Sequence, residues 1–167
     1  MVYQFTTAAE AVGATVQRFP DTAAAITYLG NLIGTGKVSF SAVPKEYEEL
    51  LEAFSPAALT EYPDVGFCIS VARAGIARTG SLLLELRDPA ERSATALAPI
   101  HFVLIKASTI LPDLRAASTL LEAALNDGVN AYLSITTGPS RTADIERVLT
   151  IGVHGPKELH ILILEGA

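Results

Sequence analysis

Short runs of apolar residues, many of them β-branched, recur along the chain and are separated by more polar stretches. Several of these runs are continuous rather than alternating, which is typical of strands buried on both faces of a sheet. The runs predict strands at residues 14–19, 37–42, 65–71, 81–86, 100–107, 130–136 and 159–164.

The stretches between most of these runs have helical spacing of apolar positions. They predict helices at residues 22–32, 45–54, 113–126 and 141–151. Asp21 is the expected N-cap of the first helix, and Pro44 and Pro112 suit the beginnings of the second and third. Alternating strands and helices indicate an α/β fold, three-layer α/β/α, with a mostly parallel sheet. We expect a single domain over residues 1–167.

Residues 65–100 break this alternation. The segment leaves little room for a full crossover helix, so we expect some of its strands to pair as hairpins or to be joined by loops. The charged stretch at residues 87–95 lies between apolar runs and is the expected mobile loop.

Composition narrows the class of protein. The chain has 167 residues, of which 50% are hydrophobic, and this is enough for one sizeable core. No apolar run reaches the roughly 18 residues of a membrane span, and no secretory signal is evident, so we expect a cytoplasmic protein that does not bind a membrane. The net charge of −6, without a basic cluster, argues against nucleic acid. The low charged fraction, 18%, favours a homo-oligomer or a partner complex.

The cysteine and the histidines exclude several chemistries. Cys68 is the single cysteine, so the chain cannot form an internal disulfide or hold an iron–sulfur cluster by itself. Its apolar run predicts an inert core thiol, with a catalytic nucleophile as the alternative. The histidines lack a regular ligand spacing, so we expect no structural metal. His160 is expected inside a strand as a buried structural residue, and His101 at the start of another strand.

Residues 137–160 concentrate the special residues of the chain. Gly138 and Pro139 predict a turn, and Ser140 or Thr142 can cap the predicted helix at 141–151. Such a loop could present N–H groups and hydroxyls to an anion at the N-terminus of a helix, with Arg141 adding further donors. Alternatively, the hydroxyls serve their own backbone in a capped turn.

Acidic residues complicate the anion interpretation. Asp144 and Glu146 would lie near the first turn, where they complement the helix dipole and would repel a phosphate. Asp144 could instead pair with Arg141 or hold a histidine. His154, with a glycine on either side of it nearby, suits proton transfer near neutral pH, or it could simply fix a turn.

A second candidate turn is Thr79-Gly80-Ser81, which carries two hydroxyls and a glycine before an apolar strand. It could bind a carboxylate or phosphate, or it is a plain entry into the strand. Other motifs are absent. The sequence has no Walker loop, no serine-hydrolase elbow and no dinucleotide fingerprint, so we expect no nucleotide cofactor.

Three stretches resemble the LUD (lactate utilisation) domain family, LutC type. The longest combines Gly138-Pro-Ser-Arg-Thr-Ala-Asp-Ile-Glu146 with Gly152-Val-His-Gly-Pro156 and Leu159-His160. The others are Ala74-Gly-Ile-Ala-Arg-Thr-Gly-Ser-Leu-Leu-Leu84 and Leu97-Ala-Pro-Ile-His-Phe-Val-Leu104. The resemblance runs from about Asp64 onward. Arg78 departs from it, because the family usually has an acidic residue there.

The resemblance implies the three-layer fold of NagB/RpiA/CoA-transferase-like proteins. It also implies a non-redox subunit of an L-lactate to pyruvate system, working beside iron–sulfur and cysteine-rich lactate-utilisation proteins. Within this chain the resemblance favours a ligand-binding role for eight residues of the two candidate turns. They are Thr79, Gly80, Ser81, Gly138, Ser140, Arg141, Thr142 and Glu146. The alternative is a stand-alone small-molecule enzyme, an acid–base hydrolase, isomerase or transferase, in which His154 and Asp144 are catalytic. We name the loop at residues 136–142 the Ser140 loop. We expect residues 138–146 and 152–154 to meet at one edge of the sheet, with Thr79 and Ser81 nearby.

Overall fold

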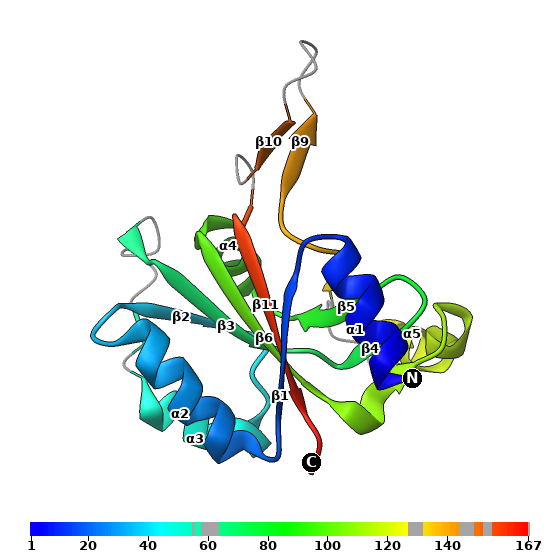
Figure 1. Cartoon of the computed structure of the whole chain (residues 1–167), viewed down its shortest axis with the longest axis horizontal. Coiled ribbons are helices and arrows are strands. Elements are labelled where there is room, and N and C mark those ends of the chain that lie inside the picture. Colours follow the sequence, from blue (N-terminus) through cyan, green and yellow to red (C-terminus); the bar gives the residue numbers. More distant parts are fainter. Residues whose placement is uncertain (55, 58–63, 127–131, 144–148, 152–154, 167) are drawn as a thin grey trace.

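A central sheet of parallel strands organises the molecule (Figure 1). The computed structural model describes residues 1–54, 56–57, 64–126, 132–143, 149–151 and 155–166. The central sheet has the order β1-β11-β6-β3-β2, and every neighbouring pair in it is parallel. Its strands are β1 (Thr15–Phe19), β2 (Val38–Ser41), β3 (Phe67–Val71), β6 (Ile100–Lys106) and β11 (Glu158–Leu164).

A second sheet and a two-stranded ribbon complete the described β-structure. The second sheet has the order β7-β4-β5-β8, with antiparallel pairing of β5 to both its neighbours. Its strands are β4 (Ala74–Ile76), β5 (Ser81–Leu86), β7 (Ile110–Leu111) and β8 (Tyr132–Thr136). The ribbon consists of β9 (Arg141–Ala143) and β10 (Leu149–Ile151), and it projects from the body of the protein (Figure 1).

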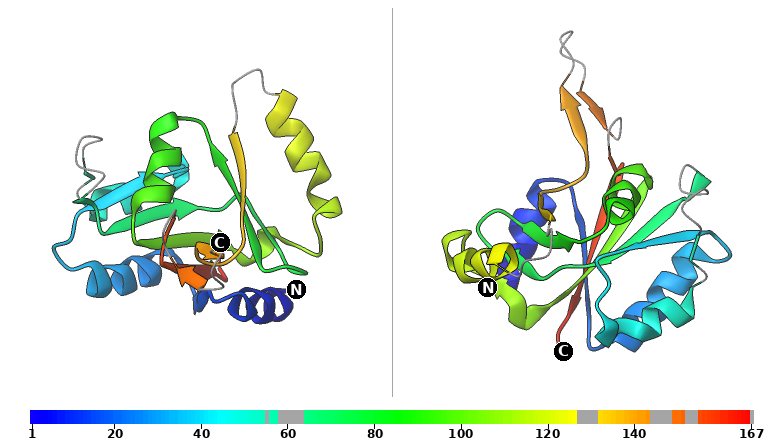
Figure 2. Two further views of the ribbon diagram at one scale, coloured as in Figure 1. Left: turned by 90° about the horizontal axis from the view of Figure 1, so that it is seen from above. Right: turned by 180° about the vertical axis from the view of Figure 1, so that it is seen from behind.

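Helices cover both faces of the central sheet (Figure 2). The α-helices are α1 (Val2–Ala11), α2 (Thr22–Ile33), α3 (Glu48–Ala53), α4 (Pro89–Leu97) and α5 (Ser118–Asn126). Short 3-10 turns lie at η1 (Lys45–Tyr47), η3 (Ala107–Thr109) and η4 (Arg115–Ala117). As expected, Asp21 caps α2, and its Oδ1 atom accepts from the N–H of Ala24 at 2.8 Å.

Two large clusters form most of the core among the described residues, because side chains alternate across the strands of the central sheet. On one face, Leu29 of α2 and Leu50 of α3 pack with Ile69 and Phe102 of the sheet. The opposite face packs against α1 and the second sheet, with Phe5 as its largest fully buried side chain. These layers confirm the predicted three-layer α/β fold with a mostly parallel sheet.

The prediction of a helix at residues 141–151 is wrong for those residues of the range that the structure describes. Residues 141–143 and 149–151 are strands that pair antiparallel, with Arg141 opposite Ile151 and Thr142 opposite Thr150. β-Branched residues at Thr142, Thr150 and Ile151 favour this extended pairing over a helix. Residues 144–148, between the two strands, lie outside the described residues.

The prediction of a mobile loop at residues 87–95 is also wrong, because most of this stretch forms α4. Asp88 is the N-cap, Pro89 occupies the first turn, and Glu91 completes a capping box. The hairpin expected in residues 65–100 is confirmed by the antiparallel pair β4 and β5. No helix in the described parts of the chain is long and apolar enough to cross a membrane.

Candidate functional site

The loop around Ser140 packs tightly against the end of α1. Gly138 has a positive φ of 68°, and a Cβ atom there would come within 2.5 Å of the carbonyl oxygen of Val12. Arg141 donates from Nη2 to the same carbonyl oxygen at 2.7 Å. Gly138 and Arg141, both predicted ligand-binding residues, therefore hold this loop on α1.

The Ser140 loop also contacts the segment before β11. The N–H of Ser140 donates to the carbonyl of Pro156 at 2.9 Å, and Gly155 lies against the Ser140 side chain. The structure therefore places residues that directly follow His154 beside the Ser140 loop. Asp144, Glu146 and His154 themselves lie outside the described residues, so their roles stay predictions.

The Thr79 turn joins the same region through hydroxyl groups. Thr79 Oγ1 lies 2.7 Å from Ser81 Oγ, which in turn lies 2.7 Å from Thr137 Oγ1. Gly80 has a φ of 66°, and a Cβ atom there would come within 2.2 Å of the backbone nitrogen of Ala9. The structure thus brings Thr79 and Ser81 to the start of the Ser140 loop, where their hydroxyls bond one another.

Arg78 lies at the rim of a separate, open hollow of about 530 Å³. Thr79, Asp113 and Arg115 line the same hollow. Asp113 is engaged there, because its Oδ1 atom accepts from the N–H of Ala116 at 3.0 Å. The residue that departs from the family pattern therefore faces solvent beside a second arginine.

Two fully buried titratable groups, His101 and Cys68, are uncharged near neutral pH. His101 Nε2 lies 2.8 Å from Ser70 Oγ, and burial lowers the pKa of His101 to about 4. Burial raises the pKa of Cys68 to about 12, which supports an inert core thiol. The ring of His160 packs on Phe102 with centroids 5.0 Å apart, in keeping with a structural role.

A cavity of about 420 Å³ opens beyond the carboxyl ends of β2, β3 and β6. In parallel α/β sheets this edge is the usual place for a ligand. One wall is apolar, and the rest carries charged side chains. The lining residues are Ala42, Val43, Pro44, Glu46, Tyr47, Val71, Ala72, Arg73, Glu85, Arg87, Glu91, Lys106 and Thr109.

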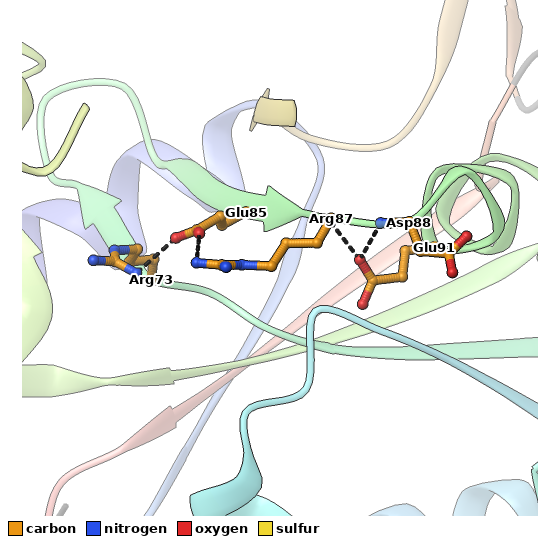
Figure 3. A network of polar contacts seen from close by, with 5 residues as sticks. All are labelled: Arg73, Glu85, Arg87, Asp88 and Glu91. Carbon is orange, nitrogen blue, oxygen red and sulfur yellow. Dashed lines mark hydrogen bonds and ion pairs between the residues drawn. The ribbon is translucent and has the colours of Figure 1, made fainter. Parts of the chain in front are cut away.

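Two guanidinium groups share one buried carboxylate in this cavity (Figure 3). Arg73 Nη1 donates to Glu85 Oε2 at 2.6 Å, and Arg87 Nη2 donates to Glu85 Oε1 at 2.5 Å. The Glu85 side chain is only 8% exposed, whereas the arginines are 42% and 48% exposed. Glu85 therefore fixes two cationic groups at the mouth of the cavity.

Glu91 joins the beginning of α4 to the loop after β2. Its Oε2 atom accepts from the N–H groups of Arg87 and Asp88 at 2.6 and 3.1 Å, and its Oε1 atom accepts from Ala42 at 3.0 Å. Ala42 has a φ of 53°, the one positive value among described residues other than glycine. Such backbone strain is often found at binding sites, and Glu91 stabilises it here.

Lys106 and Tyr47 form the third side of the cavity. Lys106 Nζ donates to Glu46 Oε1 at 3.1 Å and lies 5.6 Å from the centroid of the Tyr47 ring. The hydrogen bond to Glu46 raises the pKa of Lys106, so it stays cationic. The Tyr47 hydroxyl is buried and has no hydrogen-bond partner among the described residues.

The cationic side chains of the cavity have donors beyond those used in the contacts described above. A guanidinium carries five N–H donors and an ammonium three, and Arg73 and Lys106 each use one on a carboxylate in the contacts above. Each carboxylate oxygen of Glu85 and of Glu91 already accepts a hydrogen bond. The arrangement therefore suits a ligand rich in acceptor oxygens, such as a carboxylate.

Sequence reasoning missed this cavity. Arg73 lies two residues after the strand predicted at 65–71, and Lys106 is the last residue but one of the strand predicted at 100–107. The rule that parallel sheets bind ligands at their carboxyl ends could therefore have found both. The described parts of the chain contain no group of three or more histidine, cysteine, aspartate or glutamate side chains that could hold a metal ion.

Fold and cavity together define an α/β protein with a cavity at the carboxyl edge of its central sheet. Comparison with known proteins identifies the family. Residues 59–164 match the LUD domain, and the chain belongs to the LUD domain family.

Relatives agree with this assignment. The chain is 37% identical over 101 residues to the uncharacterized protein NMB1437 of Neisseria meningitidis serogroup B, a match that covers 60% of this chain and 42% of that protein. It is 35% identical over 106 residues to lactate utilization protein C of Bacillus velezensis, with 62% and 43% covered. The matched segments thus span less than half the length of these curated relatives.

A solved structure supports the fold. The crystal structure of a DUF162 family protein from Deinococcus radiodurans superposes with a TM-score of 0.67 at 15% sequence identity. The superposition covers 98% of this chain and 95% of that one. At this identity the likeness concerns the fold alone.

Proposed function

We propose that this chain is a non-redox component of an L-lactate utilisation system and that it binds a small carboxylate anion in the cavity at the ends of β2, β3 and β6. The observation that carries the proposal is the surplus of hydrogen-bond donors around Arg73 and Lys106. The similarity to lactate utilization protein C of two Bacillus species supports the proposed role in lactate utilisation. Iron–sulfur and cysteine-rich proteins of the same system are the proposed partners.

The apolar wall of the cavity fits such a ligand. Val43, Pro44 and Val71 can pack against a short carbon chain while the guanidinium of Arg73 binds its carboxylate. The cationic and acidic side chains around the cavity balance in number, so a bound monoanion adds one uncompensated charge. We therefore expect weak binding, with Kd on the order of 1 mM.

Saturation-transfer NMR with L-lactate and pyruvate tests the binding. We expect signal from both ligands with the native protein and a strong loss of signal with Arg73→Gln. Arg18→Gln is the matched control, because Arg18 also pairs with a glutamate, Glu165, but does not line the cavity. A second variant, Arg73→Lys, keeps the charge and retains partial binding. Equal signal from Arg73→Gln and the native protein would exclude the cavity.

The non-redox part of the proposal has its own test. Oxidation of lactate requires an electron acceptor, and Cys68, the single cysteine, is buried with a raised pKa. The purified chain should lack flavin and iron–sulfur absorption and should not reduce an artificial acceptor when lactate is added. Lactate-dependent reduction by the isolated chain would contradict the proposal.

A further inference from the structure

We propose that the separate hollow beside Arg78 and Arg115 binds a phosphate-type anion. The hollow has a volume of about 530 Å³ and shares no lining residue with the cavity proposed above for a carboxylate. It lies where the parallel strands β4 and β7 end, at Ile76 and Leu111. Ligands of α/β proteins commonly lie at the carboxyl ends of parallel strands.

Arg78 and Arg115 differ from the other arginines that the structure describes. Each of the others has a partner within the chain, which is a glutamate, a backbone carbonyl or an aromatic ring. These are Arg18, Arg73, Arg87, Arg92 and Arg141. Arg78 and Arg115 are exposed, and their side chains form no ion pair or hydrogen bond within the described parts of the chain. In a chain with a net charge of −6, these two guanidinium groups make the hollow a local cationic site.

Backbone contacts hold the two arginine-bearing segments side by side. The N–H of Arg78 donates to the carbonyl of Pro112 at 3.1 Å. In the next residue, Asp113 Oδ1 accepts from the N–H of Ala116 at 3.0 Å and closes the turn that carries Arg115. Both arginines therefore extend from fixed backbone at the same edge of the second sheet.

The Thr79 hydroxyl offers a further donor to the hollow. Thr79, Ser81 and Thr137 form a chain of hydroxyl groups joined by two hydrogen bonds of 2.7 Å each, which use two of the three hydroxyl protons. Because Ser81 is buried, its own proton goes to one of its two neighbours, and the remaining proton lies on Thr79 or Thr137. An anion in the hollow favours the arrangement in which Thr79, a lining residue, donates to it.

Charge and donor geometry favour a phosphate group as the ligand. The guanidinium groups of Arg78 and Arg115 bring two positive charges, and a phosphate monoester carries about −1.5 to −2 at neutral pH with three acceptor oxygens. Such a group can accept from both planar guanidinium groups and from the Thr79 hydroxyl at once, whereas a carboxylate has only two oxygens to share among them. Ile76 and Leu114 complete the lining with apolar side chains.

Asp113 limits the affinity of this site. Its carboxylate lines the same hollow and offsets part of the positive charge, although Oδ1 bonds Ala116. The arginines are exposed, so salt screens their attraction for the anion. We therefore expect a Kd on the order of 1–10 mM. Asp113→Asn should bind phosphate more tightly, because it removes the negative charge and keeps an oxygen that accepts from Ala116.

Inorganic phosphate is the probe, added to the isotopically labelled chain at constant ionic strength while amide chemical shifts are followed. Saturable changes should centre on residues 76–79 and 113–115. Arg78→Gln and Arg115→Gln should each weaken binding about three- to tenfold, as for the loss of one exposed charge-assisted contact. Asp113→Asn should strengthen binding about twofold or more. Arg18→Gln is the matched control, because Arg18 is also exposed but does not line the hollow.

Several results would overturn the proposal. They are the absence of saturable changes at residues 76–79 and 113–115, equal phosphate affinity of Arg78→Gln and the native chain, weaker phosphate binding by Asp113→Asn, or the same changes with chloride at the same ionic strength. None of them bears on the carboxylate cavity. Pyruvate-induced changes at Ala42 and Arg73 should be the same in Arg78→Gln as in the native chain, since Arg78 lies outside that cavity.

Discussion

The cavity and the Ser140 loop are both rich in polar residues, but they use them differently. Around the Ser140 loop, the described groups bond within the chain: Arg141 to Val12, Ser140 to Pro156, and Thr79 to Ser81. In the cavity, Arg73, Arg87 and Lys106 line one space of about 420 Å³ and bond side-chain carboxylates there. A group of polar residues indicates a binding site where its side chains converge on a cavity, and a structural role where they join segments of the chain.

The glycines sharpen the same contrast. Gly80 and Gly138 have positive φ angles and lie against the backbone of Ala9 and Val12. They allow close packing of chain on chain, which is a structural requirement. The strained residue at the cavity is Ala42, and it is held by the side chain of Glu91 rather than by close packing.

The largest effect is expected from Gly80→Ala. The new methyl group would lie within 2.2 Å of the Ala9 backbone, and the positive φ adds strain. Overpacking and strain together should lower the free energy of unfolding by about 3 kcal/mol, a fall in Tm of about 6–12 °C. Thermal unfolding followed by circular dichroism measures this.

Gly30→Ala provides the matched control. Gly30 lies within α2, and a Cβ atom there meets nothing within 4 Å. Because alanine favours the helix, the free energy of unfolding should rise by about 0.5–1 kcal/mol. An unchanged Tm for Gly80→Ala would contradict the view that this turn is built for close packing.

Acid should destabilise the fold through His101. Its pKa is about 4 in the folded chain against an ordinary value of 6.5, so the unfolded chain binds the proton more tightly. The contribution is fully present above pH 6.5 and is lost as the pH falls toward 4, by about 3 kcal/mol. Urea unfolding across this range measures the slope.

His101→Gln should remove about one proton from that pH dependence. The comparison concerns the slope alone, since the variant also changes the hydrogen bond to Ser70 and its stability at pH 7. The same slope in the variant and the native chain would show that other groups cause the acid sensitivity.

Glu91→Gln should have a moderate effect on both stability and binding. The amide keeps one acceptor oxygen but places an NH₂ group against a backbone N–H of Ala42, Arg87 or Asp88. We expect a loss of about 1–2 kcal/mol in stability and weaker pyruvate binding. Glu122→Gln is the control and should change neither, because Glu122 is exposed on α5 and lies outside the cavity. Unaltered pyruvate affinity in Glu91→Gln would show that Glu91, at the beginning of α4, does not contribute to ligand binding in the cavity.

The smallest effect is expected from Arg18→Gln. Arg18 and Glu165 form an exposed ion pair, with side chains 59% and 44% exposed. Exposed pairs contribute little, so the free energy of unfolding should change by less than about 0.5 kcal/mol. A larger loss in denaturant unfolding would show that the edge strand β1 depends on this pair.

The sequence predicted the central sheet well because its strands are buried on both faces and continuous in apolar character, as in β6 and β11. It failed at residues 141–151, where caps and glycines resemble helix signals but β-branched residues pair as strands. It also missed the cavity, since Arg73, Glu85 and Lys106 are far apart in sequence and meet only through strand order. Local sequence patterns indicate individual helices and strands. A cavity lined by residues from several strands depends on the order of those strands in the sheet, which local patterns do not contain.

The most direct test of the account is a map of amide chemical shifts on the isotopically labelled chain as pyruvate is added. The account predicts the largest changes at Ala42, Arg73 and Lys106, around the cavity. It predicts only small changes at Gly138, Ser140 and Arg141, which hold their loop on the end of α1 and on the segment before β11. Large changes confined to residues 138–141, with none at the cavity, would contradict it and return the anion site to the Ser140 loop.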